Sequence, residues 1–171
     1  MSHDAGTVSE ALLAHEQLFS SLVARFPFLQ KRPGNVDDNA AVDVPSVRLL
    51  EFAFALRDEL GFDMLADLAG CDWGELARPR FGIVCHFHKI TAREYLRVAV
   101  NAPDDLAPVL PSLTSLYPSA NWFEREAFDL FGIRFDGHPD LRRILLWEEY
   151  PGHPLRKDFP LAGPSVELPQ P

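Results

Sequence analysis

The sequence has little cysteine: only Cys71 and Cys85 occur among 171 residues. An iron–sulfur cluster is normally held by four thiolates, and structural zinc by four Cys or His ligands at short paired spacings. The sequence also lacks GxGxxG, Walker-type, HExxH and GxSxG motifs. We therefore expect no electron- or hydride-transfer centre built by this chain alone, and we interpret both cysteines as small core residues in a reducing compartment.

A long hydrophobic run is also missing. The longest stretch without a charged residue or His runs from Leu106 to Phe123, and Pro108, Pro111 and Pro118 interrupt it. A lipid-exposed helix must satisfy its own backbone hydrogen bonds, so this stretch is not expected to span a membrane. The first residues show neither a basic start with an apolar core nor an Arg-rich amphipathic pattern, and we expect no secretory or mitochondrial presequence. Any link to a membrane is expected to run through a partner.

Positive charge is scarce. Lys and Arg number 16 against 25 Asp and Glu, which gives a formal net charge of −9 and a pI near 5.0. Binding to nucleic acid or to anionic lipid headgroups needs a basic face, so both are disfavoured. The hydrophobic share of 47% and the charged share of 24% are typical of one ordinary globular domain.

Apolar periodicity predicts two helices in the first part of the chain. Residues 8–26 are the first, and residues 31–39 form a turn-rich connection. A short strand is expected over residues 41–44. Pro45 then stands where a helix begins and Gly61 where one ends. The apolar stripes are Leu12, Phe19, Leu22 and Phe26 in the first helix and Leu49, Ala53, Leu56 and Leu60 in the second.

Two-residue alternation predicts strands next. It is clear over residues 81–88 and again over residues 96–100, and the polar link 89–94 makes a hairpin the natural interpretation. Residues 62–69 are ambiguous, with a strand preferred. Residues 104–119 form a proline-broken connection. Two helices followed by a hairpin-built, mainly antiparallel sheet indicate an α+β fold with two layers.

A further helix is predicted over residues 121–131, and Gly132 ends it. From Arg134 onward the chain is expected to be irregular, with an extended tail over the last ten residues. We therefore expect residues 1–133 to form a single α+β domain that includes this helix. Residues 134–171 are expected to form an irregular, partner-docking extension with a Pro-rich tail.

The predicted helix 121–131 has two different faces. Trp122, Glu126 and Asp129 share one face at helical steps, and Arg125 is spaced to pair with Asp129. A Trp beside two carboxylates is unusual on a freely solvated face, whereas interface cores favour Trp and Arg. We expect a partner to complete this face. The residues of the apolar face, expected to pack on the sheet, are Phe123, Ala127 and Leu130.

Cations that can form ion pairs with these carboxylates lie downstream in the sequence. Arg suits fixed planar contacts with carboxylates. The net stabilisation is small when such pairs are partly buried, yet removal of one partner costs about 3–5 kcal/mol. We hypothesise that the cluster specifies a docking shape, so that Glu126→Arg is rescued by a reversed partner and Glu126→Ala impairs assembly. The downstream cations are Arg142, Arg143, Arg156 and Lys157.

Other chemistry is possible for some of these groups. Carboxylates with His bind iron or manganese, or move protons, so an independent metal-dependent hydrolase is an alternative. We favour ion pairing within the fold or across an interface. The residues of this alternative site are Glu124, Glu126, Asp129 and His138.

Three further histidines have simpler interpretations. His86 and His88 share a strand face, but two ligands are too few for a metal, and a solvent or interface role is favoured. His153 titrates near neutral pH, which allows proton delivery. A hydrogen bond that fixes its turn is the favoured role.

Two long motifs then identify a family. The first contains Glu124-Arg125-Glu126, Asp129-Leu130-Phe131, His138, Arg142, Ile144 and Leu145; the second runs Gly152-His153-Pro154-Leu155-Arg156-Lys157-Asp158-Phe159-Pro160. Together they resemble the signatures of the thirty-kilodalton subunit family of respiratory complex I, the NADH-quinone oxidoreductase. The upstream elements fit the α-β-α-β-β-β plan of that family. This sequence departs from many relatives at Trp147, where they have Pro, and after Leu161, where its tail is shorter.

The resemblance implies a non-catalytic scaffold subunit in the peripheral arm of a proton-translocating NADH:quinone oxidoreductase. Its expected neighbours are the large subunit that shapes the quinone pocket and the subunit bearing the terminal iron–sulfur cluster. FMN and iron–sulfur clusters are expected in partner subunits and none in this chain. The implied location is the cytoplasmic face of a bacterial plasma membrane, with membrane contact only through the complex. The equivalent subunit of a membrane-bound hydrogenase or formate hydrogenlyase is an alternative.

The resemblance also assigns a set of signature residues to partner contact. No catalytic, cofactor-binding or metal-binding residue is expected in this set. Its members are Trp122, Glu124, Arg125, Glu126, Asp129, His138, Arg142, Arg143, His153, Arg156, Lys157 and Asp158.

Overall fold

A computed structural model describes residues 5–32 and 40–163. Helices and a mixed sheet follow one another along the chain, so the predicted α+β class is confirmed. The elements are α1 (Ala5–Arg25), β1 (Gln30–Lys31), β2 (Ala40–Asp43), the 3-10 turn η1 (Ser46–Arg48), α2 (Leu49–Asp58), β3 (Met64–Asp72), β4 (Phe81–Lys89), β5 (Glu94–Asn101), β6 (Val109–Pro111), α3 (Ala120–Phe131) and β7 (Arg134–Asp136).

The main sheet has five strands in the order β1-β2-β5-β4-β3. The predicted hairpin is confirmed: β4 and β5 pair antiparallel, with Cys85 opposite Val98. The ambiguous segment 62–69 is a strand, as preferred, and β3 continues to Asp72. Strands β2 and β5 pair in parallel, which the sequence did not predict, because alternation within a strand says nothing about which strand lies beside it.

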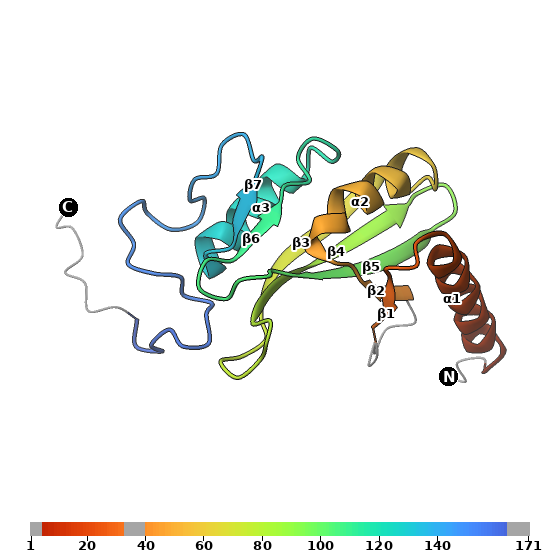
Figure 1. The fold of residues 1–171 in the computed structure, drawn as a ribbon, viewed down its shortest axis with the longest axis horizontal. Coiled ribbons are helices and arrows are strands. Elements are labelled where there is room, and N and C mark those ends of the chain that lie inside the picture. Colours follow the sequence, from red (N-terminus) through yellow and green to blue (C-terminus); the bar gives the residue numbers. More distant parts are fainter. Residues whose placement is uncertain (1–4, 33–39, 164–171) are drawn as a thin grey trace.

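Helices α2 and α3 lie on the same side of this sheet (Figure 1). Between helices and sheet lies one hydrophobic core, in which each fully buried large side chain contributes about 1.5–3 kcal/mol. A Cβ atom at Gly70 would lie 2.6 Å from the Phe131 ring, so a glycine is needed for α3 to close on β3. Core side chains with less than 2% exposure include Phe52, Leu56, Phe62, Phe81, Ile83, Phe87 and Leu96.

Helix α1 lies at one end of the molecule and the chain after β7 at the other (Figure 1). Phe26, just after α1, packs edge-on against Phe52 of α2, with ring centroids 5.2 Å apart. Leu22 and Phe26 of the predicted stripe are buried, whereas the Leu12 side chain lies outside the described residues. So do residues 33–39 of the predicted turn and residues 164–171 of the predicted tail.

Two predictions about irregular chain were wrong. Strand β6 falls in the connection predicted over residues 104–119, and β7 falls in the segment predicted to be irregular from Arg134. They pair in parallel as a separate two-stranded sheet. Strands of three residues are too short to show a period, and their pairing partners are distant in sequence. Among the described residues, no helix combines the length and apolarity needed to cross a membrane.

Candidate docking site

The end of α3 is shaped by Gly132. This residue adopts a left-handed conformation with φ of 71°, and its amide donates to the Phe128 carbonyl oxygen over 2.8 Å. Glycine adopts this conformation without the penalty of a Cβ atom. A Cβ atom here would also lie 2.5 Å from both Arg156 Nη2 and His153 Nε2. Gly132 therefore ends the helix and leaves room for the downstream chain to close over it.

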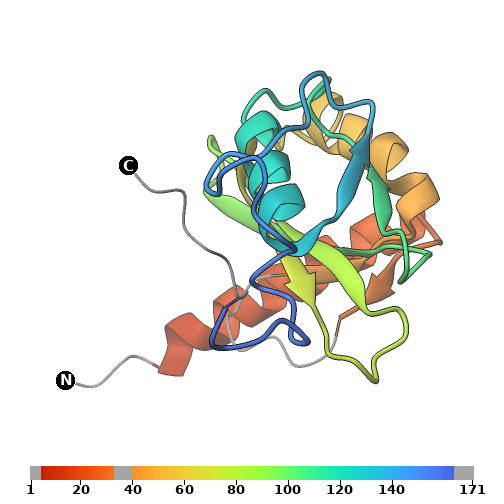
Figure 2. The same ribbon diagram turned by 90° about the vertical axis from the view of Figure 1, so that its left-hand side faces the viewer.

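Residues 137–163, which we call the extension, cap α3. The last carbonyl groups of a helix have no partner within it and need donors from elsewhere. Figure 2 shows the extension passing over α3 at the front of the molecule. Its donors are the Leu155 amide to Leu130 O (3.1 Å), Arg156 Nε to Phe131 O (2.6 Å), and His153 Nδ1 to Asp129 O (2.9 Å).

His153 serves this capping role through its ring Nδ1. A carbonyl oxygen only accepts, so the ring nitrogen beside Asp129 O carries the hydrogen. Burial, with the charges of Arg156 and Arg143, lowers the pKa of His153 below its usual 6.5, despite the hydrogen bond to Asp129 O. The turn-fixing hydrogen bond that the sequence favoured for His153 is thus present.

The Asp129 carboxylate is the main anchor of the extension. Its side chain is 0% exposed and accepts from Arg143 Nη1 (2.7 Å) on one oxygen. The other oxygen accepts from three successive amides, those of Ile144, Leu145 and Leu146, at 2.8–3.0 Å. Burial opposes ionisation, but these bonds outweigh it and lower the pKa of Asp129 below its usual value.

The predicted pair of Arg125 and Asp129 was wrong. Arg125 donates to the carbonyl oxygens of Arg142 (3.1 Å) and Arg143 (2.9 Å) instead. Its guanidinium also lies over the Trp122 ring, 5.3 Å from the centroid. The prediction that Asp129 shares an exposed face with Trp122 was also wrong, because the extension covers Asp129 and leaves Trp122 exposed. Spacing along the helix allowed the pair, but the extension supplied a better placed arginine.

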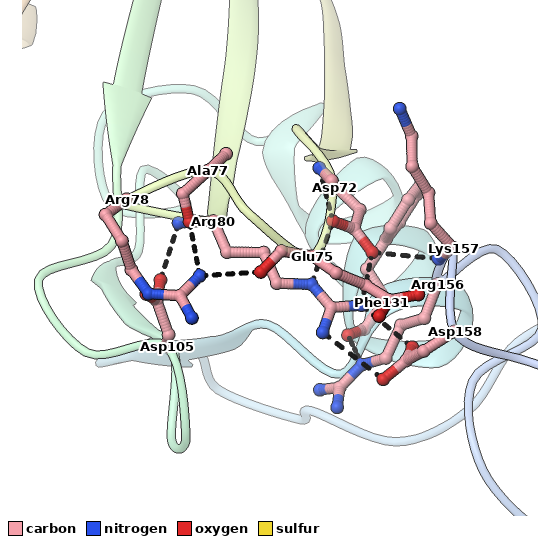
Figure 3. Close-up of polar contacts among 11 residues, drawn as sticks. Asp72, Glu75, Ala77, Arg78, Arg80, Asp105, Phe131, Arg156, Lys157 and Asp158 are labelled. Carbon is pink, nitrogen blue, oxygen red and sulfur yellow. Dashed lines mark hydrogen bonds and ion pairs between the residues drawn. The ribbon is translucent and has the colours of Figure 1, made fainter.

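A second anchor joins the extension to the loop between β3 and β4 (Figure 3). Arg80 donates to both Asp72, at the end of β3, and Asp158 in the extension, with closest distances of 2.7 and 2.8 Å. The Lys157 amide donates to Asp72 Oδ2 over 2.8 Å. Burial opposes ionisation of Asp72, but Arg80 and the amides of Lys157 and Gly74 lower its pKa to about 2.

Sequence reasoning missed Asp72 and Arg80. They lie far from the signature motifs, and no local spacing connects them with Asp158. Their contacts with the extension form only when the chain folds. The predicted pairing of downstream cations with α3 carboxylates is confirmed only for Arg143.

Glu124 is buried on the other side of α3. Its oxygens accept from the Ser112 hydroxyl (2.7 Å) and the Leu113 amide (2.6 Å), and the side chain has no exposed surface. Burial raises the pKa of Glu124 to about 7, although these two bonds favour the charged form. The carboxyl therefore ties α3 to the chain that follows β6.

The carboxylates and His138 do not converge on a shared point. Glu124 and Asp129 bind opposite neighbours, Glu126 is exposed, and His138 Nε2 lies 3.2 Å from Asn121 O. Within the described ranges, no group of three or more His, Cys, Asp or Glu residues is placed to hold a metal. The alternative acid–base or metal site is not assembled by this fold.

The histidines of β4 are engaged on the sheet. His86 Nε2 accepts from Arg97 Nε over 3.0 Å, and His88 stacks on Tyr95 with ring centroids 3.9 Å apart. Both cysteines are free; Cys85 is buried as predicted, whereas Cys71 is half-buried.

The outer surface of α3 and the extension carries large apolar side chains. Trp122 and Leu145 are each 62% exposed, although neighbouring residues are fixed by hydrogen bonds. Trp147 packs edge-on against Tyr150, with centroids 4.7 Å apart, and remains exposed. Exposed apolar groups on a rigid frame are typical of a protein-docking surface. We define the docking surface as Trp122, Leu145, Trp147, Leu155 and Leu161.

The predicted partner-contact residues divide into two groups. Trp122, Glu126, Arg142 and Lys157 are exposed and available to a neighbour, although Arg142 Nε also donates to Asp140 Oδ2 over 2.8 Å. The others are engaged in part or wholly within the chain, and partner contact by any of them stays a prediction. Those with side-chain hydrogen bonds inside the chain are Glu124, Arg125, Asp129, His138, Arg143, His153, Arg156 and Asp158.

Comparisons with known proteins agree on one family. Residues 42–165 match the family described as respiratory-chain NADH dehydrogenase, 30 Kd subunit. An NADH-quinone oxidoreductase subunit of Laribacter hongkongensis is 52% identical over 118 residues, which cover 66% of this chain and 60% of that protein. The equivalent protein of Phenylobacterium zucineum is 50% identical, with 70% and 56% covered. The chain thus spans less than two thirds of the length of these curated relatives.

Two solved structures are similar. The trypsin-resistant fragment (1-134) of Nqo5 has a TM-score of 0.62 and 34% identity, with 74% of this chain and 98% of that chain covered. A chain of the membrane-bound sulfane sulfur reductase, an archaeal respiratory membrane complex, has a TM-score of 0.72 and 20% identity, with 85% of each chain covered. The second likeness concerns the fold alone.

Proposed function

Because the chain belongs to the family of the 30 kDa subunit of respiratory-chain NADH dehydrogenase, we propose that it is a scaffold subunit of an NADH:quinone oxidoreductase. In this proposal it occupies the peripheral arm of a proton-translocating complex. It docks beside the large subunit that shapes the quinone pocket, close to the subunit with the terminal iron–sulfur cluster. Its contribution is to hold its neighbours in place while electrons pass from NADH to quinone.

The docking surface carries this proposal. The extension is held by Asp129 and by the pair of Asp72 and Arg80, so its outward apolar side chains are presented in one arrangement. A surface already ordered before association loses less conformational entropy on binding. Large aromatic side chains at the centre of an interface typically contribute about 2 kcal/mol or more each when truncated.

We propose that the redox groups belong to the partners. Two cysteines on different strands, one of them buried in the core, do not make a cluster site. FMN and iron–sulfur clusters would then lie in neighbouring subunits. Contact with the cytoplasmic face of a bacterial membrane would run through the complex.

A related hydrogenase-type complex is the second candidate. The fold alone does not identify the complex, since a chain of a different respiratory membrane complex, a sulfane sulfur reductase, has a similar fold. Identities of 50–52% to curated NADH-quinone oxidoreductase subunits favour the NADH-linked complex.

Affinity capture of this chain from gently solubilised membranes tests the proposal. We expect co-purification of flavin, iron–sulfur subunits and NADH:quinone activity. Hydrogenase activity in place of NADH oxidation would favour the second candidate, and capture of the chain alone would contradict both.

Matched variants connect the result with the docking surface. Trp122→Ala and Leu145→Ala remove exposed side chains and should reduce co-purification at least tenfold. Val47→Ala, at another strongly exposed apolar position on η1, should leave it unchanged. Equal losses in all three would mean that the docking surface is not where the partners bind.

A further inference from the structure

The docking surface is bordered by carboxylates along one half. Glu126 lies four residues after Trp122 on α3, and residues four apart are neighbours on the surface of a helix. Glu148 and Glu149 directly follow Trp147 in the extension, and all three glutamates are exposed. We define the acidic half of the docking surface as Trp122, Leu145 and Trp147 with Glu126, Glu148 and Glu149.

Asp129 brings the two parts of the acidic half together. It lies three residues after Glu126, so the two occupy neighbouring positions on α3. Its carboxylate accepts from the Leu145 and Leu146 amides over 2.8 and 2.9 Å. The chain from Leu145 to Trp147 is therefore held beside the turn of α3 that carries Glu126.

A tight turn places the two glutamates of the extension. The Tyr150 amide donates to the Trp147 carbonyl oxygen over 3.0 Å, so Glu148 and Glu149 are the two central residues of a four-residue turn. Arg143 Nη2 donates to the Tyr150 carbonyl oxygen over 2.9 Å and fixes the end of this turn. The turn thus carries both carboxylates at a defined place on the surface.

The three glutamates carry unpaired charges. None of them forms an ion pair within the part of the chain that the structure describes. Many exposed carboxylates elsewhere have a cation beside them, as Glu51 has Arg48 at 3.1 Å and Asp140 has Arg142 at 2.8 Å. The acidic half therefore presents negative charge that no described cation neutralises.

The arginines behind the acidic half are already engaged. Arg125 is buried, lies over the Trp122 ring and donates to two carbonyl oxygens of the extension. Arg143 pairs with Asp129. These contacts hold the apolar side chains in place and leave the outward glutamates to a neighbour.

The other half of the docking surface differs in charge. There Lys157 is exposed between Leu155 and Leu161, and its ammonium group forms no ion pair with a described residue. Opposite charges at the two ends of one surface orient a partner as well as attract it.

We propose that the acidic half receives the basic face of a partner subunit, on which an apolar pocket for Trp122 is bordered by Lys or Arg side chains. The proposal rests on the proposed function and adds the chemistry of the partner. An apolar centre with a polar border is the usual anatomy of a protein interface, and complementary charges speed association and fix its register. A second copy of this chain, with its own net charge of −9, and an anionic lipid surface are both disfavoured by repulsion.

Charge reversal tests the proposal on tagged chains captured with their complex from gently solubilised membranes. Glu126→Lys, and Glu148→Lys combined with Glu149→Lys, should each reduce the captured partners at least tenfold, because like charges then meet across the interface. Glu51→Lys is the control: it reverses an exposed charge on α2 and should leave capture unchanged, since an exposed ion pair contributes little to stability. The urea midpoint of each variant should equal that of the wild type.

Salt dependence separates the charges from the apolar contacts. Washing the captured complex with rising salt should release partners, because screening weakens exposed charge pairs. A chain with Glu126→Gln, Glu148→Gln and Glu149→Gln should lose its partners less steeply with salt. Trp122→Ala should capture less at every salt concentration and keep the steepness of the wild type.

Three results would contradict these inferences in different ways. Capture by the charge-reversed chains equal to that of Glu51→Lys, or the same salt dependence in the wild type and the three-glutamine variant, would overturn the basic partner face. Two differently tagged copies of this chain in one complex, separated by Glu126→Lys, would show self-association and overturn it as well. Failure of the wild-type chain to capture any complex would instead refute the proposed function.

Discussion

Replacing Asp129 with Asn should release the extension while the core stays folded. The carboxylate accepts four donors: Arg143 and the amides of Ile144, Leu145 and Leu146. Asn keeps the shape and one oxygen, but its NH2 group cannot accept a hydrogen bond. Either Arg143, whose side chain is only 14% exposed, or the three amides lose their acceptor.

The size of the effect follows from this burial. Removing one partner of a buried ion pair costs about 3–5 kcal/mol, and a hydrogen bond to a charged group contributes about 1.5–3 kcal/mol. These costs overlap, so we expect Asp129→Asn to lower the free energy of opening the extension by about 4 kcal/mol in total. That corresponds to roughly a thousandfold rise in the equilibrium for local opening of the extension.

Amide hydrogen exchange measures this opening directly. Protection of the Ile144, Leu145 and Leu146 amides should fall by up to about a thousandfold in Asp129→Asn, while amides in the core strands keep theirs. Glu126→Gln, the same chemical change at an exposed position of the same helix, is the control and should have no effect. Unchanged protection of the three amides in a folded Asp129→Asn variant would refute the anchoring role.

Three other changes have equally definite outcomes. Gly132→Ala and Gly137→Ala each place a Cβ atom at a positive φ, which costs about 1–2 kcal/mol, but only at Gly132 does the extension also crowd that atom. In urea titrations Gly132→Ala should therefore lower the free energy of unfolding more than Gly137→Ala, and equal losses would contradict the capping contacts. Glu124→Gln should flatten the pH dependence of stability: burial raises the folded pKa of Glu124 to about 7, so its contribution is complete below pH 4.5 and lost as the pH rises through 7. Urea titrations between pH 4.5 and 8.5 measure the free energy of unfolding of both proteins. Over this range the wild type should lose roughly 3 kcal/mol relative to Glu124→Gln, and an unchanged difference between the two would refute the raised pKa. The lowered pKa of Asp72, about 2, has the opposite sign: its contribution of about 2 kcal/mol is present above pH 3.8 and lost as the pH falls through 2. Exchange of the Lys157 amide should accelerate in that acid range, and Asp72→Asn should accelerate it already at pH 7; an amide insensitive to both would contradict the second anchor.

Local patterns were sufficient for most of the elements. Alternation over residues 81–88 and 96–100 predicted the β4–β5 hairpin, since a strand with one buried face must alternate. Helix α3 and its end at Gly132 were equally predictable, because only glycine adopts that conformation at low cost. The two signature motifs then indicated the family.

The sequence by itself thus determined the helices, the hairpin and the family, because these depend on residues close together in the chain. Only the tertiary structure decided which arginine binds Asp129, since Arg125 and Arg143 both carry the right charge and only Arg143 is placed beside the carboxylate. The same holds for the link from Asp72 to the Lys157 amide. A buried charge selects its partner by distance and desolvation, and neither quantity exists until the chain has folded.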